Sequence, residues 1–388
     1  MSPLQKRLNP QVNQIAVSLI RQFDERVSSI PNILKLTLGE PDFDTPEVVK
    51  EAGIKAITDN FSHYTGMSGL PELREVACAF VQKKYGVTYD WQKEAIVTVG
   101  GTEAIAATLF SMLEAGDKVL MPTPIYPGYE PVITLAKATP VYIDTSQTGF
   151  VLTPELLESA LKEHGQSVKV VILNYPSNPT GVTYSREEVA ALASVLKKYE
   201  VFVVSDEIYS ELVYDETHTS IAEFLPEQTI LINGLSKSHA MTGWRIGFIF
   251  GPEDYVREII KVHQYLVTAA STISQKAAYV ALTTGINEGQ VMKEAYQERR
   301  DFVFQKMTQF GFEVAKPSGA FYVFAKIPAA YIQNSMDFCV DLAEKAQLAI
   351  IPGIAFGQAG EGYVRISYAA SLETLTEAMN RLEKYLNI

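Results

Sequence analysis

The feature that most constrains the fold is a repeated alternation of short apolar segments and amphipathic segments in the middle of the chain. Apolar runs predict seven strands, at 95–99, 119–121, 140–143, 168–173, 201–205, 229–232 and 245–250. Between them, segments such as 186–198 repeat apolar residues at helical spacing. This alternation predicts an α/β fold with a parallel sheet covered on both faces, in which ligands bind beyond the carboxyl ends of the strands.

The pattern changes on both sides of this region. A long helix is predicted at 290–310, followed by strands and helices at 319–325, 336–346, 349–353, 363–368 and 372–386. Near the N-terminus, an amphipathic helix is predicted at 12–23 and a short strand at 36–38. We therefore predict an N-terminal arm that completes a small domain (1–45), a large domain (46–289) and a small α+β domain (290–388).

Two of the predicted strands end at residues that together carry a specific chemistry. Lys237 follows strand 229–232 and lies between Gly234 and Gly243, and Asp206 ends strand 201–205. A lysine in apolar surroundings shifts toward its neutral amine, the form that attacks a carbonyl carbon. A lysine for an aldehyde and an acid for a ring nitrogen are the pair that a pyridoxal phosphate site requires.

Other strand ends supply candidate ligands for the same cofactor. Gly101 and Thr102 precede a predicted helix at 104–113, whose N-terminus can bind a phosphate, although Thr102 could instead only cap that helix. Tyr126 can stack on a flat ring or fill the core. Asn178 can donate an amide hydrogen to a ligand oxygen, or its Asn-Pro pair can serve only as a turn.

Arg365 lies between Val364 and Ile366 in a predicted strand, where a charge needs a partner. A guanidinium group matches a carboxylate in a bidentate manner, so the α-carboxylate of an amino acid is a suitable partner, with an internal salt bridge as the alternative. Gly39, before Pro41, permits a close approach of the backbone to a ligand or forms a plain turn.

Four motifs in this order resemble those of one enzyme family: NPTG (178–181), SDEIY (205–209), SKSHAMTGWR (236–245) and YVRIS (363–367). From about residue 36 to 368 the chain resembles the class I/II pyridoxal-phosphate aminotransferases of fold type I. Its motif sequences resemble those of bacterial aromatic amino acid and N-acetyl-diaminopimelate aminotransferases. The resemblance implies a large cofactor-binding domain with a mainly parallel seven-stranded sheet and a smaller α+β domain. It also implies a homodimer with active sites at the subunit interface.

The resemblance also implies the site residues and the reaction. The α-amino group of an amino acid, with an aromatic one preferred, would pass to a 2-oxo acid such as 2-oxoglutarate through a Schiff base with pyridoxal phosphate. The substrate's side chain would contact residues 15–20 and the region of Tyr265 of the partner subunit. The implied catalytic residues are Lys237, Asp206 and Tyr209; the cofactor-binding residues are these three with Gly101, Thr102, Tyr126, Asn178, Ser236, Arg245 and Tyr64 of the partner subunit; the substrate-binding residues are Gly39, Asn178 and Arg365.

Composition excludes several other classes of protein. The 33 basic and 45 acidic residues give a net charge of −12, which disfavours nucleic-acid binding. The absence of a signal-like apolar region and of any membrane-length apolar run predicts a cytoplasmic protein without a membrane partner. The two cysteines, Cys78 and Cys339, are expected to be buried free thiols, and the five scattered histidines predict no metal site.

Alternatives to aromatic transamination remain. N-acetyl-diaminopimelate or another amino acid can be the substrate of an aminotransferase of the same class. A C–S β-lyase would use the same Lys237 and Asp206. A non-enzymatic ligand-sensing module would need a DNA-binding segment, for which the first forty residues show no pattern. The last alternative is a doubly wound protein without a cofactor.

Overall fold

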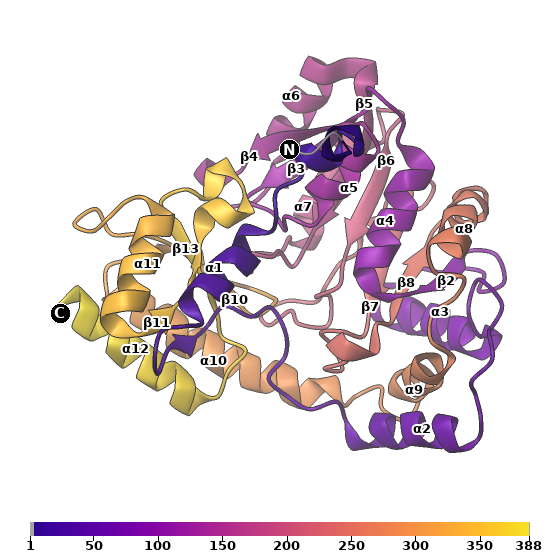
Figure 1. Ribbon diagram of the computed structural model, residues 1–388. Helices are drawn as coiled ribbons and strands as arrows, with labels where there is room; N and C mark the ends of the chain where they lie inside the picture. Colours follow the sequence, from indigo (N-terminus) through magenta and orange to yellow (C-terminus); the bar gives the residue numbers. More distant parts are fainter. Residues whose placement is uncertain (1–3, 388) are drawn as a thin grey trace.

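A seven-stranded sheet forms the centre of the larger part of the molecule (Figure 1). The computed structural model describes residues 4–387, so residues 1 and 388, the outer limits of the predicted domains, lie outside it. Strand β8 runs antiparallel to both of its neighbours, and all other neighbouring strands are parallel, which confirms the mainly parallel sheet. In spatial order the strands are β2 (Ala95–Thr98), β8 (Gly247–Phe250), β7 (Thr229–Gly234), β6 (Phe202–Asp206), β5 (Val168–Asn174), β3 (Lys118–Thr123) and β4 (Thr139–Asp144).

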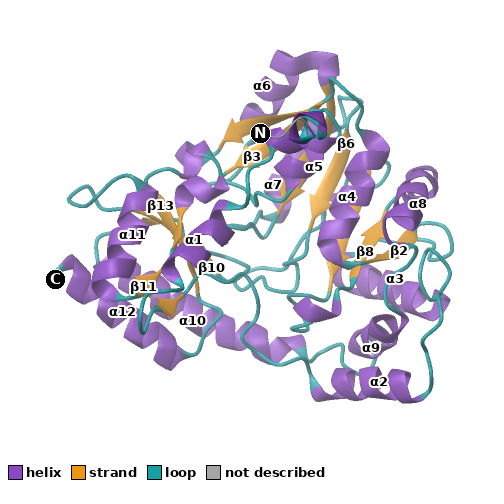
Figure 2. Cartoon of the chain, in the orientation of Figure 1, coloured by secondary structure: helices purple, strands orange, loops and turns teal. Residues whose placement is uncertain are grey.

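Helices cover both faces of this sheet (Figure 2). Successive side chains of a strand point to opposite faces. In β7, Ile230 and Ile232 pack with α4 (Gly100–Met112), α5 (Tyr129–Leu135) and α8 (Glu253–Val267). Leu231 packs on the other face with α2 (Glu47–Thr58), α3 (Pro71–Tyr85) and α9 (Thr272–Leu282). Further along that face, the sheet is covered by α6 (Pro154–His164) and α7 (Arg186–Leu196).

A second core lies beside the sheet, at the left of Figure 1. It contains a four-stranded antiparallel sheet in the order β12 (Ile351–Pro352), β13 (Tyr363–Ser367), β10 (Tyr322–Lys326) and β9 (Glu313–Val314). Strand β1 (Leu34–Lys35) pairs with β11 (Leu348–Ala349). The helices are α1 (Leu19–Val27), α10 (Gly289–Gln309), α11 (Ser335–Ala346) and α12 (Leu372–Leu386). Because Phe23 and Val27 of α1 are buried in this core, the N-terminal segment packs with the C-terminal one. The domain limits at 45 and 289 stay predictions.

The helix predicted at 12–23 is wrong in its first half. Residues Val12–Gln14 form a single 3₁₀ turn, and the α-helix begins only at Leu19. The apolar spacing was misleading because Val12 and Val17 are exposed and do not continue the buried stripe of Phe23 and Val27. The segment before the helix instead runs along a cleft described below.

Smaller differences affect positions near the site. Strand β1 ends at Lys35, so the strand predicted at 36–38 lies too late in the chain. Helix α4 begins at Gly100 rather than at 104, because a positive φ of 72° at Gly100 turns the chain directly out of β2. Arg245 lies in the turn before β8, with a φ of 56°, and not in the strand. After β8 the chain forms two helices, α8 and α9, which are separated at Thr268.

None of the helices among residues 4–387 combines the length and the apolar character needed to cross a membrane.

Candidate active site

A cleft of ≈ 730 Å³ opens at the carboxyl ends of β5, β6 and β7, with side chains of the second core on its other wall. The position agrees with the expectation that ligands of such sheets bind beyond the strand ends. Every predicted site residue except Tyr64 lines this cleft, namely Gly39, Gly101, Thr102, Tyr126, Asn178, Asp206, Tyr209, Ser236, Lys237, Arg245 and Arg365.

Lys237 lies in the turn after β7, where its ammonium group is almost enclosed by protein. Its Nζ donates a hydrogen bond to the carbonyl oxygen of Gly39 and lies 5.7 Å from the ring centroids of Tyr209 and Phe321. Burial lowers the pKa of the Lys237 amine to about 8, against a smaller opposing effect of the Glu40 carboxylate. About a tenth of this amine is therefore uncharged at pH 7, far more than for an ordinary lysine.

Asp206 is the last residue of β6 and is buried. Its Oδ2 accepts a hydrogen bond of 2.6 Å from the hydroxyl of Tyr129, and its Oδ1 accepts one from the amide of Ile208. Burial raises the pKa of the Asp206 carboxyl to about 6, although the Tyr129 bond works in the opposite direction. A carboxylate held in this way favours a positively charged donor beside it.

The N-terminus of α4 and Arg245 form a positively charged corner of the cleft. A side chain at Gly100 would place Cβ 2.5 Å from Nη2 of Arg245, so the guanidinium lies directly on the first turn of the helix. The N-cap residue Val99 has no side chain that bonds the first helical amides, and the Glu103 carboxylate accepts only from the amide of Val99 itself. Thr102 therefore does not cap the helix, and its hydroxyl and the first amides are available to an anion.

Arg365 is buried, with 2% of its surface exposed, and has no ion-pair partner among the residues that the structure describes. Its Nη1 donates to Oδ1 of Asn178 at 3.0 Å, its Nη2 donates to the carbonyl oxygen of Thr37 at 2.6 Å, and Nε has no partner in the same range. The guanidinium also lies against the rings of Tyr322 and Phe356. The internal salt bridge considered above is thus wrong, and the buried charge is left for an external anion.

Tyr209, Asn178 and Gly39 are held around this arginine and Lys237. The Tyr209 hydroxyl bonds that of Tyr322 at 2.7 Å, and burial raises the pKa of the Tyr209 phenol well above its usual value. Since Oδ1 of Asn178 accepts from Arg365, the amide nitrogen of Asn178 can donate to a ligand. A Cβ on Gly39 would lie 2.6 Å from the Tyr322 hydroxyl, so only glycine fits there.

Two of the predicted residues line the cleft with few interactions of their own. Tyr126 is half-buried and packs edge-on against Tyr129, with ring centroids 5.5 Å apart, so it is neither a plain core residue nor a free one. Ser236 is buried beside Lys237.

Tyr64 lies away from these residues. Its side chain is 88% exposed and does not line the cleft, and Tyr265 is 87% exposed. Met67 and Leu266, their near neighbours in sequence, are also exposed apolar residues. Within one chain, the structure therefore does not bring Tyr64 or Tyr265 to the site.

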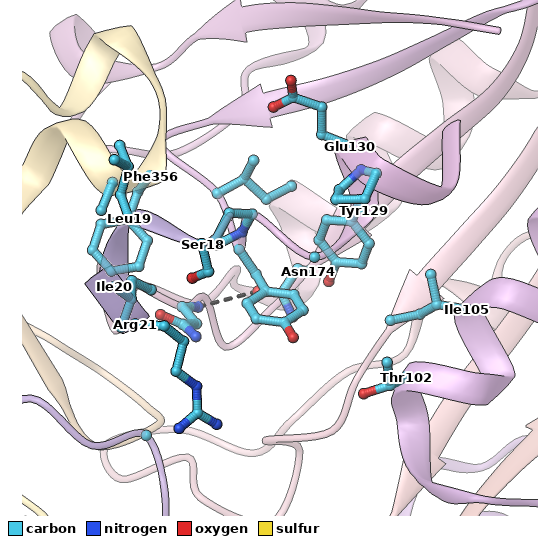
Figure 3. Close-up of a pocket in the computed structure, with 18 of the residues that line it drawn as sticks. Ser18, Leu19, Ile20, Arg21, Thr102, Ile105, Tyr129, Glu130, Asn174 and Phe356 are labelled. Atoms are coloured by element: carbon cyan, nitrogen blue, oxygen red, sulfur yellow. Dashed lines mark hydrogen bonds between the residues drawn. The ribbon is translucent and has the colours of Figure 1, made fainter. Parts of the chain in front are cut away.

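Sequence reasoning missed several residues that line the cleft. Tyr129 and Tyr322 bond Asp206 and Tyr209, and the Nδ2 of Asn174 donates to the backbone oxygen of Asp206. Asn174, as the last residue of β5, could have been found from its strand-end position. Residues 14–21 also line the cleft, which includes the predicted 15–20 segment, and Figure 3 shows Ser18 to Arg21 across the cleft from Thr102.

No group of three metal-ligating side chains occurs between residues 4 and 387. Cys78 and Cys339 are buried free thiols, as expected.

The chemistry of this cleft fits pyridoxal phosphate. The corner formed by Gly100, Thr102 and Arg245 supplies amides, a hydroxyl and a guanidinium for a phosphate. The buried Asp206 offers an acceptor for a protonated ring nitrogen, and the Lys237 amine has a lowered pKa. The unpartnered Nε of Arg365 leaves donor capacity for a carboxylate.

Comparisons with known proteins agree with this set of cleft residues. Residues 31–382 match the family described as aminotransferase class I and II. The chain is 50% identical to the probable N-acetyl-LL-diaminopimelate aminotransferase of Bacillus subtilis, over 98% of this chain and 95% of that protein.

Solved structures give the same result. The chain is similar to the aspartate aminotransferase from Thermus thermophilus with maleate, with a TM-score of 0.92 and 34% identity over 97% of this chain and 99% of the other. It is also similar to the aromatic aminotransferase from Pyrococcus horikoshii OT3, with a TM-score of 0.88 and 36% identity over 94% and 98% of the two chains. The chain thus belongs to the class I and II aminotransferases, a family of enzymes that depend on pyridoxal phosphate.

Proposed function

We propose that this chain transfers the α-amino group of an amino acid to a 2-oxo acid, with Lys237 as the residue that carries pyridoxal phosphate. The observation that supports this assignment most directly is that the half-buried Lys237, whose amine has a lowered pKa, and the buried Asp206 line the same cleft. When bound, the cofactor supplies an aldehyde that joins the amino group and a pyridine ring that accepts the electron pair left on the α-carbon.

Lys237 has two tasks in this proposal. Its neutral amine forms the covalent link to the cofactor, and the lowered pKa favours that form. The free Lys237 amine would also act in general acid–base catalysis, as the group that accepts the proton lost from the substrate's α-carbon and donates it again to complete the amino transfer.

Asp206 and its neighbours set the charge around the ring. The Asp206 carboxylate, whose Oδ2 is oriented by Tyr129, would keep a ring nitrogen protonated. Tyr209 and the amide of Asn178 would donate to the ring's phenolic oxygen, and Tyr126 would stack on the ring. Gly101, Thr102, Ser236 and Arg245 would hold the phosphate.

Arg365 binds the substrate's α-carboxylate in this proposal, with Gly39 and Asn178 beside it. The bonds of Arg365 to Asn178 and to the Thr37 oxygen fix the guanidinium before a substrate arrives. A fixed guanidinium fork orients the α-carbon toward Lys237, and such positioning lowers the barrier of the reaction.

We further propose that the enzyme is a homodimer whose active site includes Tyr64 of the partner subunit. The 88% exposure of Tyr64 and 87% exposure of Tyr265 support a second chain on this face, since exposed aromatic residues with apolar neighbours favour an interface. The two buried free thiols support a reducing compartment such as the cytoplasm.

For the substrate, we propose N-acetyl-LL-diaminopimelate, with an aromatic amino acid as the second candidate. The 50% identity to the Bacillus subtilis protein of that name exceeds the 36% identity to the aromatic aminotransferase of Pyrococcus horikoshii OT3. The Thermus thermophilus structure was solved with maleate, itself a dicarboxylate, which also supports a dicarboxylic ligand. This order reverses the preference drawn from the sequence motifs alone.

The test begins with the cofactor link. The protein is incubated with pyridoxal phosphate, reduced with borohydride and digested, and the label is expected on Lys237. Label on another residue would contradict the assignment. A panel of N-acetyl-LL-diaminopimelate, phenylalanine, tyrosine and aspartate with 2-oxoglutarate then ranks the substrates. Pyruvate released from cystathionine without any added 2-oxo acid would indicate a β-lyase instead.

A further inference from the structure

We propose that Arg21 binds the second carboxylate of a dicarboxylic substrate and thereby selects dicarboxylic amino and 2-oxo acids over monocarboxylic ones. This inference rests on the proposed function, because it assigns the distal end of the same substrate.

Three arginines line the cleft, and none of them has a carboxylate partner within residues 4–387. Arg365 bonds only the amide oxygen of Asn178 and a backbone oxygen. Arg245 bonds the backbone oxygen of Thr242. Arg21 forms no hydrogen bond or ion pair with any described residue, and its side chain is exposed. The three arginine charges of the cleft therefore have no carboxylate partner among residues 4–387.

The acidic side chains of the cleft do not neutralise Arg21. Asp24 accepts from Lys35 and Thr37, and Glu130 accepts from Tyr142. In the same way, the remaining two acids are bonded elsewhere: Asp206 accepts from Tyr129, and Glu40 accepts from Thr242.

The three arginines lie at different places in the cleft, so we expect each of them to bind a different anionic group. Arg245 lies on the first turn of α4, where a phosphate binds. Arg365 is buried and is the α-carboxylate site of the proposed function. Arg21 comes from α1, and Figure 3 shows its guanidinium ending clear of the other labelled side chains. A cofactor phosphate and one carboxylate account for two of the three guanidinium groups, so the third corresponds to another anionic group of the substrate.

The surroundings of Arg21 indicate what joins the two carboxylates. Leu19, Ile20 and Phe356 line the cleft and lie close together in Figure 3. Apolar side chains of this kind accept methylene groups. The geometry therefore fits an aliphatic dicarboxylic acid, whereas an aromatic monocarboxylic acid would leave Arg21 without a partner.

The experiment compares two 2-oxo acids that differ only in the second carboxylate, 2-oxoglutarate and 2-oxopentanoate. Single-turnover rates are measured with the cofactor-loaded enzyme in its amino form, as kcat/KM for each acid. In Arg21→Gln, the value for 2-oxoglutarate is expected to fall by about 10- to 100-fold, the range of a lost charge-assisted hydrogen bond, with the value for 2-oxopentanoate unchanged. Arg21→Lys is expected to restore part of the difference, because it keeps the charge without the fork.

Arg26→Gln is the matched control, because Arg26 is exposed on the same helix and does not line the cleft. An equal loss for both acids in Arg21→Gln, or no loss for either, would overturn the assignment of Arg21 while leaving the proposed function in place. A wild-type enzyme that converts neither acid would overturn the proposed function, and the assignment of Arg21 with it.

Discussion

The two walls of the cleft are built differently. On the sheet side, Asp206 and Tyr209 are buried and bonded to other side chains of the protein. On the α1 side, Arg21 is exposed and unbonded within the described residues, and the segment before the helix is extended. The sheet wall is preorganised, as chemistry common to a family requires. The α1 wall can adapt, which suits a region that distinguishes substrates.

The largest effect is expected on the sheet wall, at Lys237. Lys237→Ala should lower the rate of amino transfer by roughly 10³-fold or more, because the variant loses both the covalent link and the proton carrier. Steady-state transamination measures it. Lys162→Ala, exposed on α6, serves as the control and should keep full activity. A Lys237→Ala enzyme with a tenth of the normal rate would show that another group moves the proton.

The pH dependence of Lys237 tests how far burial prepares this wall. Below pH 8 its amine is protonated and unreactive, and above pH 8 it is neutral, so carbamylation of the cofactor-free protein by cyanate should rise with a midpoint of about 8. A lysine in a peptide reacts with a midpoint of about 10.4, so the neutral fraction of the Lys237 amine is about 10²-fold larger near neutral pH. Mass spectrometry of the digested protein gives the carbamylation rate of Lys237, and the same measurement on a lysine peptide gives the reference rate. Equal midpoints for Lys237 and the peptide would show that burial does not lower the pKa of the Lys237 amine.

Arg365 contrasts with Arg21, because its effect should not depend on the second carboxylate. Arg365→Lys loses the fork that bonds Asn178 and the Thr37 oxygen. The KM of every amino acid and 2-oxo acid is expected to rise by about 10- to 100-fold. The KM values for 2-oxoglutarate and 2-oxopentanoate test this expectation. A rise confined to the dicarboxylic acid would mean that the two arginines have been assigned to the wrong ends of the substrate.

The smallest effect is expected at Tyr64, which lies on neither wall within one chain. Tyr64→Phe removes only a hydroxyl and should weaken pyridoxal phosphate binding by about fivefold, the size of one neutral hydrogen bond. Titration of the cofactor-free protein by absorbance measures the Kd. Tyr331→Phe, whose hydroxyl bonds the Leu386 oxygen, is the matched control and should leave the Kd unchanged. An unaltered Kd in Tyr64→Phe would contradict the proposal that Tyr64 of the partner subunit contacts the phosphate.

Much of the sheet wall could be predicted from the sequence, because parallel strands put their carboxyl ends at one edge. Asp206 is the last residue of β6 and Asn178 lies shortly after β5, and both strands were predicted within a residue or two from local patterns. Tyr322 and Tyr129 were missed because their bonds to Tyr209 and Asp206 join residues 113 and 77 positions apart, which no local spacing encodes. The start of α1 was misplaced because exposed and buried apolar residues look alike in a periodic pattern.

Arg21 and Arg365 stand on elements of the same core, since α1 is anchored there by Phe23 and Val27 and β13 by Val364 and Ile366. Any rigid displacement of that core relative to the seven-stranded sheet would carry both guanidinium groups together. The distance between the two guanidinium groups would then stay constant. The enzyme would therefore select the same spacing between two carboxylates in its open and closed states.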